Sequence, residues 1–244
     1  MSELTKNQKI SVMVGVILAM LLSALDQTIV ATAMPRIAQE LNGFEHLSWL
    51  FTSYMLASTI IVPIYGKLSD MYGRKYFYIS GIIIFLIGSA LSGAAQDMTQ
   101  LIIFRAIQGL GGGAIMVNSF AVIGDIFPPA ERSKWQGLIG GVFGLSSVAG
   151  PLIGGALTDA GNWRWVFYVN IPVGIIALAV VWYVLPRIVP EARKRSIDVL
   201  GALTMAASLI CLLLACVWGG TEYAWGSSQI IGLFVGAALS LAAF

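Results

Sequence analysis

Residues 101–123 read LIIFRAIQGLGGGAIMVNSFAVI, and residues 11–33 read SVMVGVILAMLLSALDQTIVATA. Each stretch is long and apolar enough to cross a bilayer as a helix, for which about 20 residues suffice. Each also carries one charge in its interior, Arg105 in the first and Asp26 in the second. An isolated charge at the bilayer centre costs about 2.5–3.5 kcal/mol, so such residues face a protein interior or a watery cavity. The two stretches predict a bundle of membrane-spanning helices with a polar pathway inside it.

The rest of the chain has the same character, with 58% hydrophobic and only 11% charged residues and a mean hydropathy of +0.85. Soluble domains carry about 25% charged residues, so the composition indicates an all-α membrane protein. Seven runs predict complete spans: Ser11–Ala33, Trp49–Leu68, Phe77–Ala95, Leu101–Ile123, Gly137–Leu157, Val166–Leu185 and Val199–Trp218. The eighth run, 230–244, is too short for a full span, and we interpret the chain as a fragment that ends inside a helix.

Lysine and arginine set the expected orientation, because they are enriched in cytoplasmic loops. With the N-terminus inside, eleven of the fourteen basic residues fall in inner segments, two in outer segments and Arg105 within the membrane. We therefore expect a cytoplasmic segment 1–10, a six-helix bundle 11–185, a cytoplasmic loop 186–198, and one extra helix with a truncated successor in 199–244. The expected location is the inner (plasma) membrane of a bacterium.

An internal repeat relates the segments that follow the second and fifth spans. Gly66 and Gly155, Leu68 and Leu157, and Asp70 and Asp159 are each 89 residues apart, and Arg74 matches Arg164 with one inserted residue. Three spans separate the two segments, so they lie on opposite faces of the membrane. An inverted three-plus-three repeat of this kind is typical of secondary transporters, although two similar glycine-containing turns could also arise by chance.

These motifs resemble those of the major facilitator superfamily. Gly66, Asp70, Gly73, Arg74 and Lys75 match its motif between helices 2 and 3, which the resemblance implies is a cytoplasmic gate. Arg105, Gln108 and Gly109 match its helix-4 motif. A helix-5 antiporter motif matches at Gly150, Pro151, Gly154 and Gly155, with Ser146 where that motif usually has glycine.

The segments around Asp26 and Trp163–Gly174 further resemble the 14-span drug:proton antiporters. The short loop 186–198 fits that subgroup as well. The resemblance implies the N-terminal bundle of such a transporter, with one extra helix, part of a second, and a C-terminal bundle that is absent from this chain.

Asp26 and Arg105 are predicted at similar depths, so they can pair. We expect Asp26 to bind a proton or a cationic substrate, with Arg105 biasing its protonation, since burial disfavours and a nearby arginine favours a charged carboxylate. The simpler interpretation is a fixed ion pair that joins two helices. At the outer end, Asp159 and Arg164 are candidates for a second gate, beside tryptophans that also suit an interfacial anchor.

The function expected from these residues is proton-coupled export of amphipathic or cationic compounds by alternating access. Its partners would be the lipid bilayer, protons, those small molecules, and the missing bundle or a partner chain. Two alternatives stay open: a transporter of one metabolite, and a receptor or non-transporting membrane fragment. The sequence has no nucleophile–base set, phosphate loop, metal-ligand spacing or nucleic-acid motif, so we expect no enzyme, no metal, no cofactor and no nucleic-acid partner.

Overall fold

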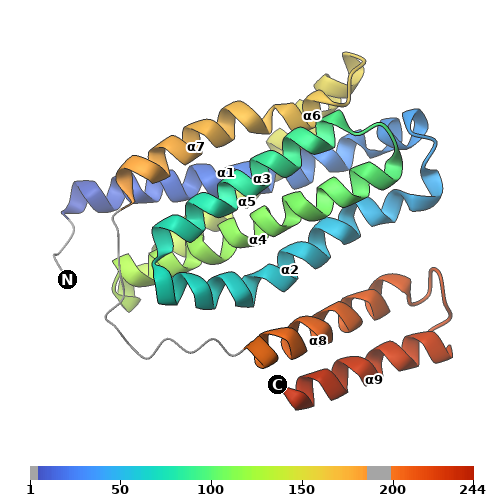
Figure 1. The fold of residues 1–244 in the computed structure, drawn as a ribbon. Coiled ribbons are helices and arrows are strands. Elements are labelled where there is room, and N and C mark those ends of the chain that lie inside the picture. The colour runs from blue at the N-terminus through green and yellow to red at the C-terminus, as the bar shows by residue number, and fades with distance from the viewer. Residues whose placement is uncertain (1–4, 186–198) are drawn as a thin grey trace.

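The computed structural model describes residues 5–185 and 199–244. Its described part is almost entirely helical (Figure 1). The elements are α1 (Lys6–Glu40), the short 3₁₀ helix η1 (Phe44–His46), α2 (Leu47–Tyr72), α3 (Arg74–Ala94), α4 (Met98–Ile126), α5 (Pro129–Asp159), α6 (Trp165–Tyr168), α7 (Asn170–Val184), α8 (Val199–Trp218) and α9 (Ser228–Ala243).

Within the described residues, seven helical segments are long and apolar enough to span a membrane, with α6 and α7 together forming one of them. These segments coincide with the seven runs predicted from hydropathy, and α9 is a shorter apolar helix. The all-α membrane fold is therefore confirmed. The predicted loop 186–198 lies outside the described residues.

Most helices extend beyond the apolar runs, because hydropathy locates the bilayer core whereas hydrogen bonding defines the helix. A capping box between Thr5 and Gln8 starts α1, and the Asp97 side chain caps α4 by accepting from Gln100 N at 2.8 Å. Helix α5 begins with Pro129 in its first turn, eight residues before the predicted span.

Helix ends differ from the predicted span ends in two places. The second span was predicted to end at Leu68, but α2 continues to Tyr72 and α3 starts at Arg74. Only Gly73 lies between them, with φ 104°, a conformation that favours glycine. The sixth span, predicted as Val166–Leu185, is found as Trp165–Val184, and its helix is interrupted at Val169 between α6 and α7. Pro172 explains the break, since it has no N–H for Tyr168 O and its ring clashes with that carbonyl.

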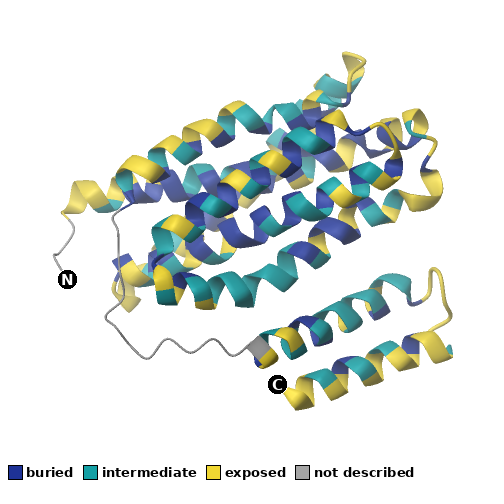
Figure 2. Ribbon diagram, viewed as in Figure 1, coloured by how far each residue is buried: buried dark blue, intermediate teal, exposed yellow. Residues whose placement is uncertain are grey.

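The packing of the first six spans is internally symmetric. Helix α4 packs mainly on α2 and α3, and α1 packs mainly on α5 and α7. Exchanging spans 1–3 with spans 4–6 turns one set of contacts into the other, as an inverted repeat requires. Helices α1 and α4 are the most buried and lie at the centre of the bundle (Figure 2).

The core is divided into two apolar clusters along the helix axes. On α1, the first cluster includes residues up to Leu22 and the second begins at Ile29. On α4 the order is reversed, because Leu101 belongs to the second cluster and Ile115 to the first. The interval between the clusters contains both Asp26 and Arg105.

The hairpin of α8 and α9 lies beside α2 at the edge of the bundle (Figure 1). The rings of Trp49 and Trp218 meet edge to face, with centroids 6.0 Å apart. Within the hairpin, Ser208 Oγ donates to Ala237 O at 2.9 Å. Among the described residues, the hairpin makes its main contacts with α2 and not with the parts of α1 and α4 that contain Asp26 and Arg105.

Candidate functional site

Asp26 and Arg105 form an ion pair at the centre of the bundle. Arg105 Nη1 lies 2.6 Å from Asp26 Oδ2, and both side chains are completely buried. Helix α1 supplies the carboxylate and α4 the guanidinium, as their predicted depths indicated. The short distance is that of a charge-assisted hydrogen bond, which is stronger than one between neutral groups.

Amide side chains complete the surroundings of the carboxylate. Asp26 Oδ1 accepts from Gln108 Nε2 at 2.8 Å and from Asn170 Nδ2 at 2.7 Å. Arg105 Nη1 also donates to Gln108 Oε1 at 2.7 Å. Asn170 comes from α7 and additionally donates to Ser89 Oγ on α3 at 3.0 Å. We call Asp26, Arg105, Gln108, Asn170 and Ser89 the polar centre, which joins α1, α3, α4 and α7.

The other side of the guanidinium is covered by aromatic rings. Arg105 Cζ lies 4.4 Å from the centroid of the Tyr54 ring and 5.9 Å from that of the Phe167 ring. These distances are within the range of cation–π attraction. Arg105 Nε and Nη2 are buried and have no hydrogen-bond partner. Two donors of the guanidinium are thus available to an acceptor that enters this space.

Close backbone packing holds the polar centre in place. A Cβ on Gly88 of α3 would lie 2.5 Å from Gln108 Cα, which is closer than Cβ atoms in proteins approach other atoms. A Cβ on Gly109 would collide with Tyr54 O. Glycine at these positions allows α2 and α3 to approach α4 closely. The helix-4 motif therefore contributes Gln108 to the carboxylate and Gly109 to the α2–α4 contact.

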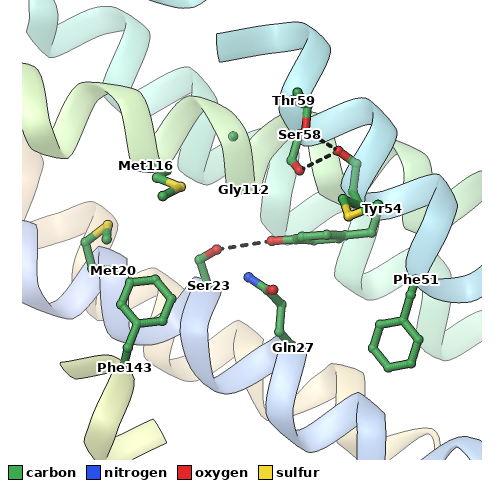
Figure 3. Close-up of a pocket in the computed structure, with 12 residues that line it drawn as sticks. Met20, Ser23, Gln27, Phe51, Tyr54, Ser58, Thr59, Gly112, Met116 and Phe143 are labelled. Atoms are coloured by element: carbon green, nitrogen blue, oxygen red, sulfur yellow. Dashed lines mark hydrogen bonds between the residues drawn. The ribbon is translucent and has the colours of Figure 1, made fainter. Parts of the chain in front are cut away.

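A pocket of about 320 Å³ opens beside this site, between α1, α2, α4 and α5 (Figure 3). Its large apolar lining residues are Met20, Phe51, Tyr54, Met55, Met116 and Phe143. Its polar lining residues are Ser23, Gln27, Ser58 and Thr59. None of the described residues that line it is charged. Methionine and aromatic side chains adapt to ligands of different shapes.

At the end of the bundle where α2 meets α3, Arg74 is the centre of an ionic cluster. It forms ion pairs with Asp70 and, at 2.9 Å, with Asp125 Oδ2, and it donates to Ser69 Oγ at 2.8 Å. A Cβ added to Gly66 would lie at ordinary contact distance from Val117, and Lys75 follows Arg74 in the first turn of α3. The motif thus ties the α2–α3 turn to the end of α4.

At the opposite end, Arg164 does not pair with Asp159 in the described structure. Asp159 is exposed at the last turn of α5, while Arg164 donates to the carbonyl oxygens of Gly93 and Ala95 at the end of α3. Gly161, with φ 85°, redirects the chain between the two residues. The cation therefore neutralises the carbonyl end of a helix, which is a favourable position for positive charge.

The helix-5 motif has two faces. Gly150 and Gly154 contact α1 so closely that an added Cβ would collide with Thr28 and Thr32, respectively. Gly155 has open space where a Cβ would lie, and Pro151 is exposed. Gly137, Gly140, Gly141 and Gly144 also have open space. Only part of the glycine pattern therefore serves packing within this bundle.

Four residues that take part in these sites were not proposed from the sequence: Tyr54, Ser89, Asp125 and Asn170. The one clue in the sequence was the shared depth of Asp26 and Arg105 in the membrane, because polar residues at the same depth tend to face one another. Within the described residues, no cluster of three or more His, Cys, Asp or Glu side chains could hold a metal ion.

Long apolar helices around a buried ion pair define a multi-pass membrane protein. The family model described as Major Facilitator Superfamily matches residues 16–244, and the chain belongs to this superfamily. The chain is 52% identical to Multidrug resistance protein 3 of Bacillus subtilis over 96% of its own length and 45% of that relative. It is 48% identical to Multidrug transporter protein MdtP of the same organism, over 100% of this chain and 45% of that protein.

The solved structures of similar fold include the human organic anion transporter MFSD10, with a TM-score of 0.71 at 17% identity, over 93% of this chain and 60% of that one. The proton:xylose symporter XylE gives a TM-score of 0.66 at 14% identity, over 96% of this chain and 53% of that one. These likenesses show the fold. The chain spans less than half the length of the two Bacillus subtilis relatives.

Proposed function

We propose that the intact protein exports amphipathic, often cationic compounds in exchange for protons. The observation that carries this proposal is the buried Asp26–Arg105 pair, which is separated from a pocket lined by methionines by the ring of Tyr54. The names of the two Bacillus subtilis relatives, a multidrug resistance protein and a multidrug transporter, support the same substrate class.

Asp26 is the proton site in this proposal. Protonation removes its negative charge and weakens its bond to Arg105, while Gln108 and Asn170 continue to hold the side chain. Arg105 then becomes an uncompensated cation, which is costly in a buried environment. Proton binding and rearrangement of the centre are therefore coupled, and competition between a proton and a cationic substrate for the anionic site gives exchange.

The pocket supplies the contact surface for substrate. Its aromatic and methionine side chains favour flat, polarisable compounds, and its few hydroxyl and amide groups allow several orientations. Because its described lining has no charge of its own, a cationic substrate would draw on the aromatic faces and on the field of Asp26.

Alternating access requires a second bundle that rocks against this one around the shared site. We propose that the open face of α5 meets that bundle, because Gly137, Gly140, Gly141 and Gly144 leave room there for close approach. The Arg74 cluster and the Arg164 contacts would then serve as the inner and outer gates. The excess of basic residues on one side supports a cytoplasmic N-terminus in a bacterial inner membrane, and we propose no enzymatic role.

The test is Asp26→Asn in the intact transporter reconstituted in proteoliposomes. Asparagine keeps the shape of the side chain but cannot carry the negative charge or exchange a proton at neutral pH. We expect loss of substrate-driven proton movement, measured with an internal pH dye, and loss of uphill efflux of a fluorescent cation. Asp97→Asn is the matched control, because Asp97 is exposed and asparagine also caps helices well.

Full coupling in Asp26→Asn would remove Asp26 from the mechanism. If the unmodified transporter exports one compound among many tested, the alternative of a transporter for a single metabolite would be favoured. Complete absence of transport by the intact protein would favour a non-transporting role.

A further inference from the structure

We propose that Tyr54 is a movable seal between the substrate pocket and the polar centre, and that an aromatic substrate opens it. This inference rests on the proposed exchange of substrate for protons. It assigns to one side chain the step by which occupancy of the pocket is communicated to Asp26.

Tyr54 borders both regions. Its side chain lines the pocket near Ser23 and Gly112 (Figure 3). On its other side, the ring covers the guanidinium of Arg105, whose Cζ lies 4.4 Å from the ring centroid. Arg105 itself is absent from the pocket lining and is completely buried. A ligand in the pocket therefore meets the Tyr54 ring before it can meet the ion pair.

The backbone of Tyr54 is fixed while its side chain is held by few polar contacts. Its carbonyl oxygen lies where a Cβ on Gly109 would be, so α2 and α4 are in direct contact at this point. The hydroxyl group bonds to Ser23 Oγ at 3.1 Å, and the Gln27 side chain lies beside it (Figure 3). It also lies against Gly112, where any side chain would occupy its position. Movement here consequently takes place in the side chain, which would give up its hydroxyl contacts, its ring–cation contact and its packing in the first apolar cluster, all of which a substrate must replace.

The groups beneath the ring favour such a movement when the pocket is filled. Arg105 Nε and Nη2 have no acceptor while the ring covers them. Buried donors without partners carry a free-energy cost, so water or a substrate acceptor admitted at this point would stabilise the guanidinium. A flat cationic substrate can in turn stack on the displaced tyrosine ring and replace its contact with Arg105.

Displacement of the ring changes the environment of Asp26. Among the described residues, the titratable group that faces the Asp26 carboxylate is Arg105 from α4, and the one that faces the Arg105 guanidinium is Tyr54 from α2. The neutral Gln108 and Asn170 provide the remaining contacts. Admitted water weakens the attraction within the ion pair, because the interaction falls as the effective dielectric constant rises. It also gives a path for a proton to the carboxylate. In the empty pocket, the closed ring prevents this exchange and so prevents a proton leak.

The experiment measures proton leak and coupling in the intact transporter in proteoliposomes with an internal pH dye. Ethidium serves as the aromatic cationic probe. Tyr54→Leu removes the ring and the hydroxyl bond, and we expect the ethidium-independent proton leak to rise about tenfold or more. Tyr54→Phe and Ser23→Ala both remove the hydroxyl bond but keep an aromatic ring over Arg105, and each should raise the leak about fivefold.

Tyr65→Leu is the matched control. Tyr65 lies on the same helix and also forms one hydroxyl contact, with Ser80 at 3.3 Å, but it does not line the pocket. Its leak should equal that of the unmodified protein. If Tyr54→Leu does not fold, Tyr54→Phe and Ser23→Ala still carry the test, since both preserve the packing.

Leak rates unchanged in all variants of Tyr54 and Ser23, with full coupling to ethidium, would overturn the assignment of Tyr54 while leaving proton exchange intact. Absence of ethidium-driven proton movement in the unmodified transporter would instead contradict the proposed function. The two failures are therefore distinguishable in the same assay.

Discussion

Replacing Arg105 by leucine tests how the polar centre is stabilised. The substitution removes the guanidinium and leaves Asp26 Oδ2 without its donor at 2.6 Å. Gln108 and Asn170 still donate to Oδ1, so the carboxylate retains two hydrogen bonds from neutral groups. Leucine also leaves the Tyr54 ring without the cation beneath it.

The expected cost is large because both side chains are completely buried. Breaking a buried ion pair from one side destabilises a protein by about 3–5 kcal/mol. Removing both charges together avoids the unpaired carboxylate, so the double variant Asp26→Asn with Arg105→Leu should lie within about 2 kcal/mol of the unmodified protein. The exposed pair of Arg36 and Glu40 offers the control, since Arg36→Leu should cost at most about 1 kcal/mol.

The assay is unfolding of the intact transporter in mixed micelles by increasing denaturing detergent, followed by tryptophan fluorescence. The informative quantity is the coupling free energy from the double-mutant cycle. A cost for Arg105→Leu no greater than that for Arg36→Leu would refute the argument. Strict additivity of the two single substitutions would refute it as well, since independent residues have no coupling.

Two further substitutions examine the packing and the outer contacts. Gly88→Ala should lower the free energy of unfolding by about 1–3 kcal/mol, because its Cβ would fall on the backbone of α4. Gly124→Ala is the control and should be neutral or slightly stabilising, because a Cβ there would meet nothing within 4 Å. Equal effects in the same unfolding assay would contradict the α3–α4 contact. Arg164→Ala should lower the free energy of unfolding by about 1.5–3 kcal/mol, because two carbonyl oxygens lose a charged donor. Asp159→Asn is the control and should change it by no more than about 0.5 kcal/mol. A comparable loss for Asp159→Asn would indicate that Asp159 takes part in the contact between Arg164 and the end of α3.

Hydropathy was sufficient to place the spans, and the buried charges were sufficient to identify the central pair. A span of apolar residues has few alternatives in a bilayer, and two opposite charges at the same depth stabilise one another. The partners of that pair were harder to predict. Ser89 is one of several serines on α3, and only the rotation of that helix about its axis brings it to Asn170.

The predicted outer gate of Asp159 and Arg164 remains a prediction, and its local geometry differs from that of the inner cluster despite the similar sequences. In the first repeat, Asp70 and Arg74 are four residues apart, a spacing that places the two side chains together on a helix. In the second repeat the spacing is five, and α5 ends at Asp159. Asp125 was missed for a related reason, because an acidic residue at the end of a span resembles any solvated residue until its partner is known.

The opposite charges at the polar centre have an electrical consequence. With Asp26 and Arg105 both ionised, the centre is neutral overall, and a voltage across the membrane does no net work when it is displaced. In the proposed exchange, a proton on Asp26 leaves one positive charge, and moving that charge through the full potential involves about 2.3 kcal/mol per 100 mV. A cell that is negative inside would then bias the protonated form inward, so export of a neutral compound would draw on the membrane potential as well as on the pH gradient. A monovalent cation carried outward costs the same electrical work, so its one-for-one exchange with a proton would draw on the pH gradient alone.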